Sequence, residues 1–439
     1  MKRLLALLTV TLWLAGCTWT VDMRSDDEPA EGGAEAPDPF FVEARLFYPE
    51  RIALPGDAEM LVAVDAVGPD GRRSLTRFNT RLEGRQVPVP LGFSVQPEND
   101  APSIYELSAA VLAGDELLRL TGPVLVMPKD GGAELGEVRL HEPIAAGFGQ
   151  AWQCGDTEVM FGAVDEHLFL AVDERLHSVE QVPAASGVRY RARDESGWGI
   201  HEKGGEILLL RGDEAFSDCR RIEALTAPLS GGGNEPGWRV EIGKDRIELT
   251  SDYGQTVTSA PVVQTGSSGR TTRFRGLGEH GPILAAFEQT ICRDSATGMP
   301  HPYSLAVQFE DGRLDGCGGE PRDLLTANTW QVVQLGDDPV PEPEGEDEEI
   351  EITLTFDEKG RVGGRAACNR YTAGYELGGE GLAIGPAAAT KMACREPLMT
   401  LESRFLGLLA GVGRFDIGPD GELILIGPQG RIIAIAQGL

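Results

Sequence analysis

Aromatic residues and positive charges are scarce in this chain. Phe, Trp and Tyr make up 6% of its 439 residues, and only 39 Lys and Arg accompany 69 Asp and Glu. Together with 57 Gly and 28 Pro, this composition favours short strands and turns over long helices. The formal net charge of −30 argues against nucleic acid as a partner. It would attract a basic protein at long range, although solubility alone explains the charge equally well.

Motifs of common enzymes and metal sites are missing as well. No two cysteines have C-x-x-C spacing, so zinc and thioredoxin chemistry have little support. Residues 276–281, "GLGEHG", satisfy G-x-G-x-x-G, but no βαβ pattern follows and we interpret them as a β-turn. Residues 265–269 lack nucleophile-elbow spacing, and no pattern brings Asp294 and Glu235 together as a carboxylate pair. We therefore expect no enzyme, no cofactor, no metal site and no small-molecule substrate.

The one long hydrophobic run, residues 4–14, is too short to span a bilayer. Lys2 and Arg3 precede it, and "LAGC" ends it at Cys17. This arrangement resembles the signal peptide and lipobox of bacterial lipoproteins, here residues 1–17. The resemblance implies cleavage before Cys17 and attachment of acyl chains such as palmitate, which anchor a protein firmly. Thr18 in place of Asp favours the outer membrane, facing the periplasm. The acidic residues 18–40 are expected to form a disordered tether.

Six cysteines remain after Cys17. An even number in an oxidising compartment indicates disulfides, and six cysteines allow 15 pairings. Their clustering along the chain favours three pairs, each of which contributes roughly 3–4.5 kcal/mol on the loop-entropy model. The expected pairs are Cys154–Cys219, Cys292–Cys317 and Cys368–Cys394.

The rest of the chain divides into four modules. Residues 41–135 alternate apolar and polar positions between turns, which predicts a small β-sandwich. Within them, "RIALPGDAEMLVAV" (51–64) and "GRQVPVPLGF" (84–93) resemble the YbaY/YscW lipoprotein family. That resemblance implies an envelope lipoprotein domain, in some members a chaperone of secretion components, without catalytic residues.

Two further modules carry resemblances that imply a mostly β fold. Residues 230–322 open with "NEPGW" (234–238) and close with "CRDSATGMPHPY" (292–303) and a Gly-Cys, like a family of uncharacterised envelope proteins. Residues 325–439 resemble the META domain of heat-shock-associated lipoproteins through "ACNRY" (367–371), although Ala367 stands where that family has Gly. Leu398, Leu401, Phe405 and Leu408 recur at helical spacing, which predicts a helix here.

The module at 145–222 contains short strands between Cys154 and Cys219, which predicts a small closed β-barrel. Its "SGVRY" (186–190) followed by Lys-Gly resembles the MliC family, inhibitors of c-type lysozyme, whose pattern is Ser-Gly-x-x-Tyr and then Trp-x-Lys-Gly. His201 occupies the Trp position, and Trp198 lies three residues earlier. The resemblance implies a lysozyme-binding site, made of Ser186, Gly187, Tyr190, Lys203 and Gly204.

The chemistry suits that partner. A c-type lysozyme cleft holds one protonated and one ionised carboxyl group, which a hydroxyl and an ammonium can bind. Gly187 would let the backbone approach closely, and Tyr190 would brace the hairpin. A second interpretation also stands, in which Ser186-Gly187 is only a turn and Lys203 a solvated residue. Arg189, Arg191 and Arg193 would repel basic lysozyme unless Asp194, Glu195 and Glu202 offset them.

The sequence therefore predicts a mainly β, multidomain chain. A β-sandwich precedes small disulfide-bonded, barrel-like domains, and a short helix lies in the last domain. The predicted function is a cell-envelope lipoprotein that inhibits c-type lysozyme by placing Ser186 and Lys203 in its catalytic cleft. The alternative is a non-inhibitory envelope-stress or assembly lipoprotein, a chaperone or scaffold acting through the first and last modules.

Overall fold

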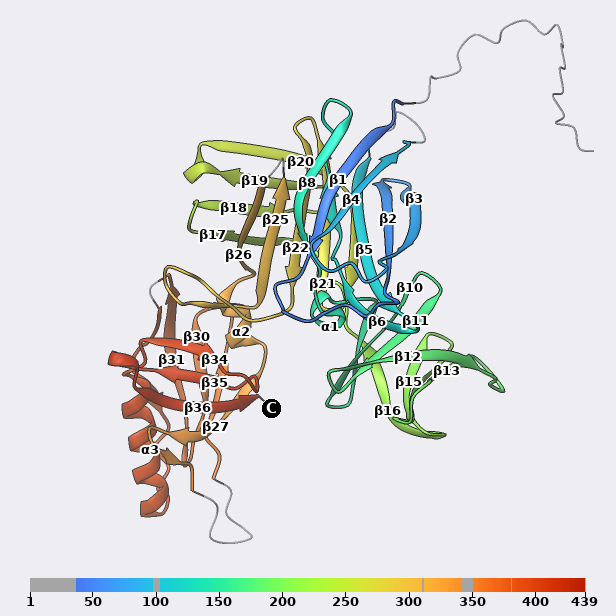
Figure 1. The fold of residues 1–439 in the computed structure, drawn as a ribbon. Helices are drawn as coiled ribbons and strands as arrows, with labels where there is room; N and C mark the ends of the chain where they lie inside the picture. Colours follow the sequence, from blue (N-terminus) through green and yellow to red (C-terminus); the bar gives the residue numbers. More distant parts are fainter. Residues whose placement is uncertain (1–36, 98–102, 310–311, 342–349, 380, 439) are drawn as a thin grey trace, which may run out of the picture. The chain divides into compact units, whose positions relative to one another are not determined.

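The computed structural model describes residues 37–97, 103–309, 312–341, 350–379 and 381–438 (Figure 1). The predicted lipobox at Cys17 and nearly all of the tether lie outside these residues. Strands dominate the described chain, as the composition predicts, and none of its helices is long and apolar enough to cross a membrane. All three expected disulfides are formed. The predicted fold class is confirmed.

The first module is a β-sandwich. Its strands alternate between buried and exposed side chains, and their inward faces enclose a core that includes Val42, Leu46 and Val62. One sheet has the order β4-β1-β8, and the other has the order β3-β2-β5-β6 with β7 paired to β5. The strands are β1 (Phe40–Phe47), β2 (Glu59–Gly68), β3 (Gly71–Arg81), β4 (Val89–Val95), β5 (Ile104–Ala113), β6 (Glu116–Leu120), β7 (Val124–Val126) and β8 (Gly132–Arg139).

The second module follows the short helix α1 (Pro143–Ala146) and is a closed barrel. Each of its eight strands pairs with its neighbours in the chain, and the last strand pairs with the first beside the Cys154–Cys219 disulfide. We call this module the first barrel. Its strands are β9 (Gln150–Cys154), β10 (Thr157–Val164), β11 (His167–Val172), β12 (Arg175–Val182), β13 (Val188–Ala192), β14 (Trp198–Lys203), β15 (Glu206–Arg211) and β16 (Glu214–Arg221).

The third module is another closed barrel of eight strands, here called the second barrel. A long connection between its sixth and seventh strands carries the hairpin β23 (Cys292–Arg293) and β24 (Pro300–His301). The Cys292–Cys317 disulfide ties this hairpin to the last barrel strand. The barrel strands are β17 (Leu229–Gly233), β18 (Trp238–Ile242), β19 (Arg246–Ser251), β20 (Thr256–Ser268), β21 (Thr271–Gly278), β22 (Gly281–Glu288), β25 (Tyr303–Phe309) and β26 (Gly312–Gly318), with η1 (Asp252–Gly254) after β19.

The last module is a strongly curved antiparallel sheet with one long helix, α3 (Glu396–Leu409) (Figure 1). Pro397 lies in the first turn of α3, and the helix buries Leu401, Phe405 and Leu409 in the core of the module. The predicted helix is confirmed. The other elements are α2 (Pro321–Thr326), β27 (Thr329–Leu335), β28 (Asp338–Pro339), β29 (Thr353–Phe356), β30 (Arg361–Ala366), β31 (Asn369–Gly378), β32 (Gly381–Ile384), β33 (Ala388–Ala389), β34 (Arg414–Ile417), β35 (Leu423–Ile426), η2 (Pro428–Gly430) and β36 (Ile432–Gly438).

Candidate functional site

Two neighbouring turns at one end of the first barrel contain the residues that the sequence singled out. Residues 183–187 connect β12 to β13, and Gly204 and Gly205 connect β14 to β15. Strands β13 and β14 are antiparallel, with Val188 opposite Glu202. The start of β13 and the end of β14 therefore lie side by side, and this register brings Ser186 and Gly187 next to Lys203.

Gly187 makes this approach possible. Its backbone has φ +70°, a left-handed conformation that glycine adopts without steric cost. A Cβ atom at position 187 would lie 2.2 Å from the carbonyl oxygen of Glu202 and 3.1 Å from Cβ of Lys203. The turn is thus packed directly on the end of β14, and only a residue without a side chain fits there.

His201 adds a hydrogen bond across the same contact. Its Nε2 atom lies 2.7 Å from the backbone carbonyl oxygen of Ser186. The ring also lies against Gly187, since Nε2 is 3.1 Å from the position that a Cβ of residue 187 would occupy. The carbonyl group of Ser186 is therefore tied to β14 by a side chain.

The polar groups of Ser186 and Lys203 face solvent. Both residues are exposed, and within the described chain neither side chain has an internal partner. Gly204 and Gly205 both have positive φ, as a two-residue hairpin turn requires. A hydroxyl and an ammonium group are thus available to an external partner on a turn pair that the backbone holds together.

Tyr190 lies in the barrel rather than on the surface. It is half-buried against the barrel core, and its ring centroid is 4.8 Å from that of Phe161. Trp198 is also buried, at the start of β14, while Lys203 ends that strand. Trp198 therefore cannot replace the Trp that the family pattern has at position 201. Tyr190 is placed to support β13, as its bracing role requires.

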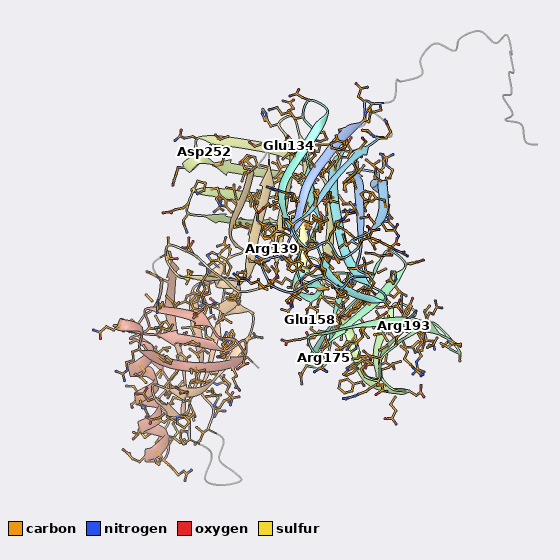
Figure 2. The ribbon with its side chains drawn as sticks, in the orientation of Figure 1. Glu134, Arg139, Glu158, Arg175, Arg193 and Asp252 are labelled. Atoms are coloured by element: carbon orange, nitrogen blue, oxygen red, sulfur yellow. A yellow bond between two sulfur atoms is a disulfide. The ribbon has the colours of Figure 1, made fainter. Side chains whose placement is uncertain are left out.

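Arg189 and Arg191 of β13, and Arg193 just after it, form ion pairs with carboxylates from other parts of the chain. Asp213, between β15 and β16, accepts hydrogen bonds from Arg189 at 2.9 Å and from Arg191 at 2.7 Å. Arg193, labelled in Figure 2, pairs with Asp115 of the sandwich at 2.9 Å. Arg193 also lies 4.0 Å from Glu180. The expected offset by Asp194, Glu195 and Glu202 stays a prediction.

Asp194 serves another purpose at the opposite end of the barrel. It lies 2.6 Å from Nδ1 of the buried His177 and accepts the backbone N–H of Ser196. Partial burial raises the pKa of Asp194, but the hydrogen bonds from Ser196 and His177 outweigh it and lower that pKa to about 2. The ionised carboxylate therefore closes the turn between β13 and β14.

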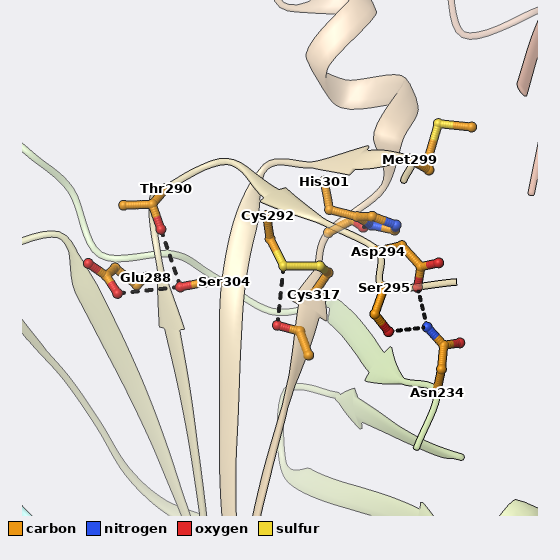
Figure 3. The surroundings of a disulfide bond; sticks show 12 residues. Asn234, Glu288, Thr290, Cys292, Asp294, Ser295, Met299, His301, Ser304 and Cys317 are labelled. Atoms are coloured by element: carbon orange, nitrogen blue, oxygen red, sulfur yellow. Dashed lines mark hydrogen bonds between the residues drawn. A yellow bond between two sulfur atoms is a disulfide. The ribbon is translucent and has the colours of Figure 1, made fainter. Parts of the chain in front are cut away.

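Asp294 has a comparable role in the second barrel (Figure 3). Asn234 of the "NEPGW" stretch donates to it at 2.7 Å, and the backbone N–H of Thr297 donates at 2.8 Å. Burial raises the pKa of Asp294, but these hydrogen bonds outweigh it and lower the pKa. In the part of the chain that the structure describes, Asp294 accepts hydrogen bonds from Asn234, Ala296 and Thr297, and Glu235 is not one of its partners. Among the described residues there is also no cluster of three His, Cys, Asp or Glu suited to a metal ion.

Three family models match separate parts of the chain. Residues 41–131 match the type III secretion system lipoprotein chaperone (YscW), and residues 152–216 match the membrane-bound lysozyme-inhibitor of c-type lysozyme. Residues 323–437 match the META domain. The chain is thus modular and mainly β, with domains similar to those of cell-envelope lipoproteins, and none of the three matched families is an enzyme family. These three resemblances are confirmed, and that of residues 230–322 stays a prediction.

Solved structures match parts of the chain. An alternative pilotin from the type II secretion system of Vibrio cholerae is 21% identical, with 24% of this chain and 99% of that chain covered, at a TM-score of 0.22. A protein from Burkholderia xenovorans, solved by NMR, is 24% identical, with 26% of this chain and 86% of that chain covered, also at 0.22. The search of curated proteins found no match.

Proposed function

We propose that the first barrel binds c-type lysozyme and blocks its catalytic cleft with Ser186 and Lys203. The observation that carries this proposal is the pair of packed turns in the module that matches the lysozyme-inhibitor family. Both side chains are exposed and without internal partners among the described residues. The packing of Gly187 on β14 holds the backbone of the two turns, so little backbone entropy is lost on binding.

The target cleft presents matching chemistry. The two carboxyl groups of a retaining glycosidase lie about 5–5.5 Å apart, one protonated and one ionised. The Lys203 ammonium would pair with the ionised carboxylate, and the Ser186 hydroxyl would hydrogen-bond the other carboxyl group. Because Asp213 pairs with both Arg189 and Arg191 and offsets one of their two positive charges, these arginines repel a basic partner less than the sequence suggested.

The anchor and location complete the proposal. Acylation of Cys17 would hold the protein in the outer membrane, facing the periplasm, with residues 18–40 as the tether. Residues 41–135, 145–222, 230–322 and 325–439 would be its four domains. Replacement of Cys17 by Ser should release the protein from the membrane fraction, and unchanged membrane association would refute the anchor.

The test of the inhibitor proposal uses the full-length protein in a lysozyme turbidity assay. Lys203→Met keeps the length of the side chain and removes its charge, and Ser186→Ala removes the hydroxyl. Loss of a buried charge-assisted contact costs about 2–5 kcal/mol, so we expect Lys203→Met to weaken inhibition roughly 30-fold or more. Lys244→Met in the second barrel and Ser74→Ala in the sandwich are exposed controls and should have no effect. If the oxidised wild type does not inhibit lysozyme, the proposal is wrong. If both site variants inhibit as strongly as the wild type, Ser186 and Lys203 are not the binding site.

A second candidate function is an assembly or stress role in the envelope. It is favoured by the match of residues 41–131 to a lipoprotein chaperone family and of residues 323–437 to the META domain. This role predicts an envelope protein that co-purifies with the full chain and is lost when residues 41–130 or 325–439 are deleted. Identical co-purification profiles for the full chain and both deletions would argue against it.

A further inference from the structure

We infer that His201 is a positioning residue for the inhibitory turn, holding the Ser186 carbonyl group so that its hydroxyl stays beside Lys203. This inference rests on the proposed function. The contact that carries it is the 2.7 Å separation between Nε2 of His201 and the carbonyl oxygen of Ser186. Together with the packing of Gly187, this contact joins the turn to β14.

The direction of this hydrogen bond is fixed by chemistry. A carbonyl oxygen only accepts, so Nε2 of His201 must carry the proton and donate. The neutral imidazole with its proton on Nε2 does so, and the imidazolium form does so as well. The contact therefore persists in either protonation state of the ring.

This assignment explains the departure of the chain from the family pattern. The pattern described above has Trp where this chain has His201, and the indole ring also carries a single N–H donor. Replacing Trp by His keeps a planar ring with an N–H at this point of β14. The feature that must be kept is the donor, and the aromatic ring alone is not sufficient.

The consequence for binding follows from the short connection. Residues 183–187 join two strands, and the backbone of Ser186 carries the hydroxyl that would enter the cleft. Without the donor, the turn would sample more conformations, and lysozyme would have to order it on binding. A net hydrogen bond of ordinary strength corresponds to about 3- to 10-fold in affinity.

Two matched pairs of variants of the full-length protein test the inference. His201→Gln and His201→Met have similar shape, and only Gln offers an N–H donor. His201→Trp and His201→Phe are both aromatic, and only Trp offers one. The first measurement is amide hydrogen exchange of residues 183–188 without lysozyme, with residues 206–211 of β15 as the internal reference. The second is the inhibition constant against lysozyme.

We expect faster exchange of residues 183–188 in the Met and Phe variants, unchanged exchange in β15, and inhibition about 3- to 10-fold weaker. The Gln and Trp variants should resemble the wild type in both measurements. Equal exchange of residues 183–188 in the Met and Gln variants would overturn the inference, and so would equal exchange in the Phe and Trp variants. Because exchange is measured without lysozyme, a wild type that fails to inhibit would refute the proposed function and leave the exchange result to decide the role of His201.

Discussion

The two barrels have the same strand order, but they differ in how accessible the connection between their fourth and fifth strands is. In each, eight strands follow one another around a closed sheet, and a Ser-Gly pair lies where the fourth strand leads into the fifth. In the first barrel, Ser186 is exposed. In the second, Gly269 is buried, and its N–H donates to the carbonyl oxygen of Gly149 at 2.9 Å. A Ser-Gly turn therefore marks a candidate site only where it remains accessible.

Further contacts occupy this turn of the second barrel. Arg273 donates to the Ser268 hydroxyl at 2.7 Å, and Arg270 forms an ion pair with Glu158 of the first barrel. On β21, Arg275 pairs with Glu106 of the sandwich at 2.6 Å, with both side chains buried. The Ser268 hydroxyl is thus bound within its own barrel, and two arginines beside this turn bind carboxylates of the neighbouring modules. This turn of the second barrel contacts other modules, whereas the turn at residues 183–187 of the first barrel is exposed to solvent.

The largest effect is expected when the packed turn of the first barrel is forced apart. In Gly187→Ala, the new Cβ would meet the Glu202 carbonyl oxygen at 2.2 Å in a left-handed backbone. We expect a loss of roughly 2–4 kcal/mol in the free energy of unfolding, and inhibition weakened about 100-fold. Differential scanning calorimetry and the turbidity assay measure the two effects.

Gly254 of the second barrel is the matched control for this substitution. It also has positive φ, but a Cβ there would meet no atom within 4 Å. Gly254→Ala should therefore lose only the cost of a left-handed alanine, about 1–2 kcal/mol, with inhibition unchanged. Equal effects of the two substitutions would contradict the packing that we assign to the first-barrel turn.

A smaller effect, a gain in stability, is expected when an alanine of the last module is replaced by glycine. Ala367 has φ +65°, where the family pattern has Gly, so the backbone before Cys368 is strained. Ala367→Gly should raise the free energy of unfolding by about 0.5–1 kcal/mol, because relief of strain exceeds the entropy cost of glycine. Denaturant titration measures this, and a less stable variant would show that the buried methyl group contributes more than the strain costs.

The smallest effect concerns acid stability. The pKa of Asp194 is lowered from 3.8 to about 2, so its stabilising contribution is complete above about pH 4 and lost as the pH falls toward 2. Asp194→Asn should remove this pH dependence, and the effect should be modest because the carboxylate is half-exposed. Melting temperatures of wild type and variant from pH 2 to 6 should converge at the acid end. A constant difference across that range would exclude the linkage.

Much of the architecture could be predicted from the sequence because its signals are local. Alternating strands, clustered cysteines and the spacing of Leu401 and Phe405 each lie within a short segment, and the structure confirms the fold class, the disulfides and the helix. The contacts that decide the site are not local. Asp213 reaches Arg189 from a turn 24 residues away, and His201 contacts Ser186 across two strands. Such contacts cannot be predicted from residue spacing along the chain, because they form only when the strands pair to close the barrel.

The contact of the Ser268-Gly269 turn with another module also could not be predicted from the sequence. Residues 265–269 were interpreted only as lacking catalytic spacing, and their contact with residues before β9 depends on how two modules pack. Gly269 is itself one signal of this contact, because a Cβ there would lie 2.7 Å from Cα of Gly147, but a glycine in a loop is too common to indicate the contact alone.

The central claim, that the open turn of the first barrel enters the lysozyme cleft, is tested most directly by competition. The inhibition constant of the full-length protein is measured against lysozyme at increasing concentrations of a chito-oligosaccharide that occupies the cleft. If Ser186 and Lys203 fill the same space, the apparent constant rises linearly with the oligosaccharide concentration, and Lys203→Met shifts the whole series to weaker inhibition. An apparent constant that does not change with oligosaccharide would contradict the account.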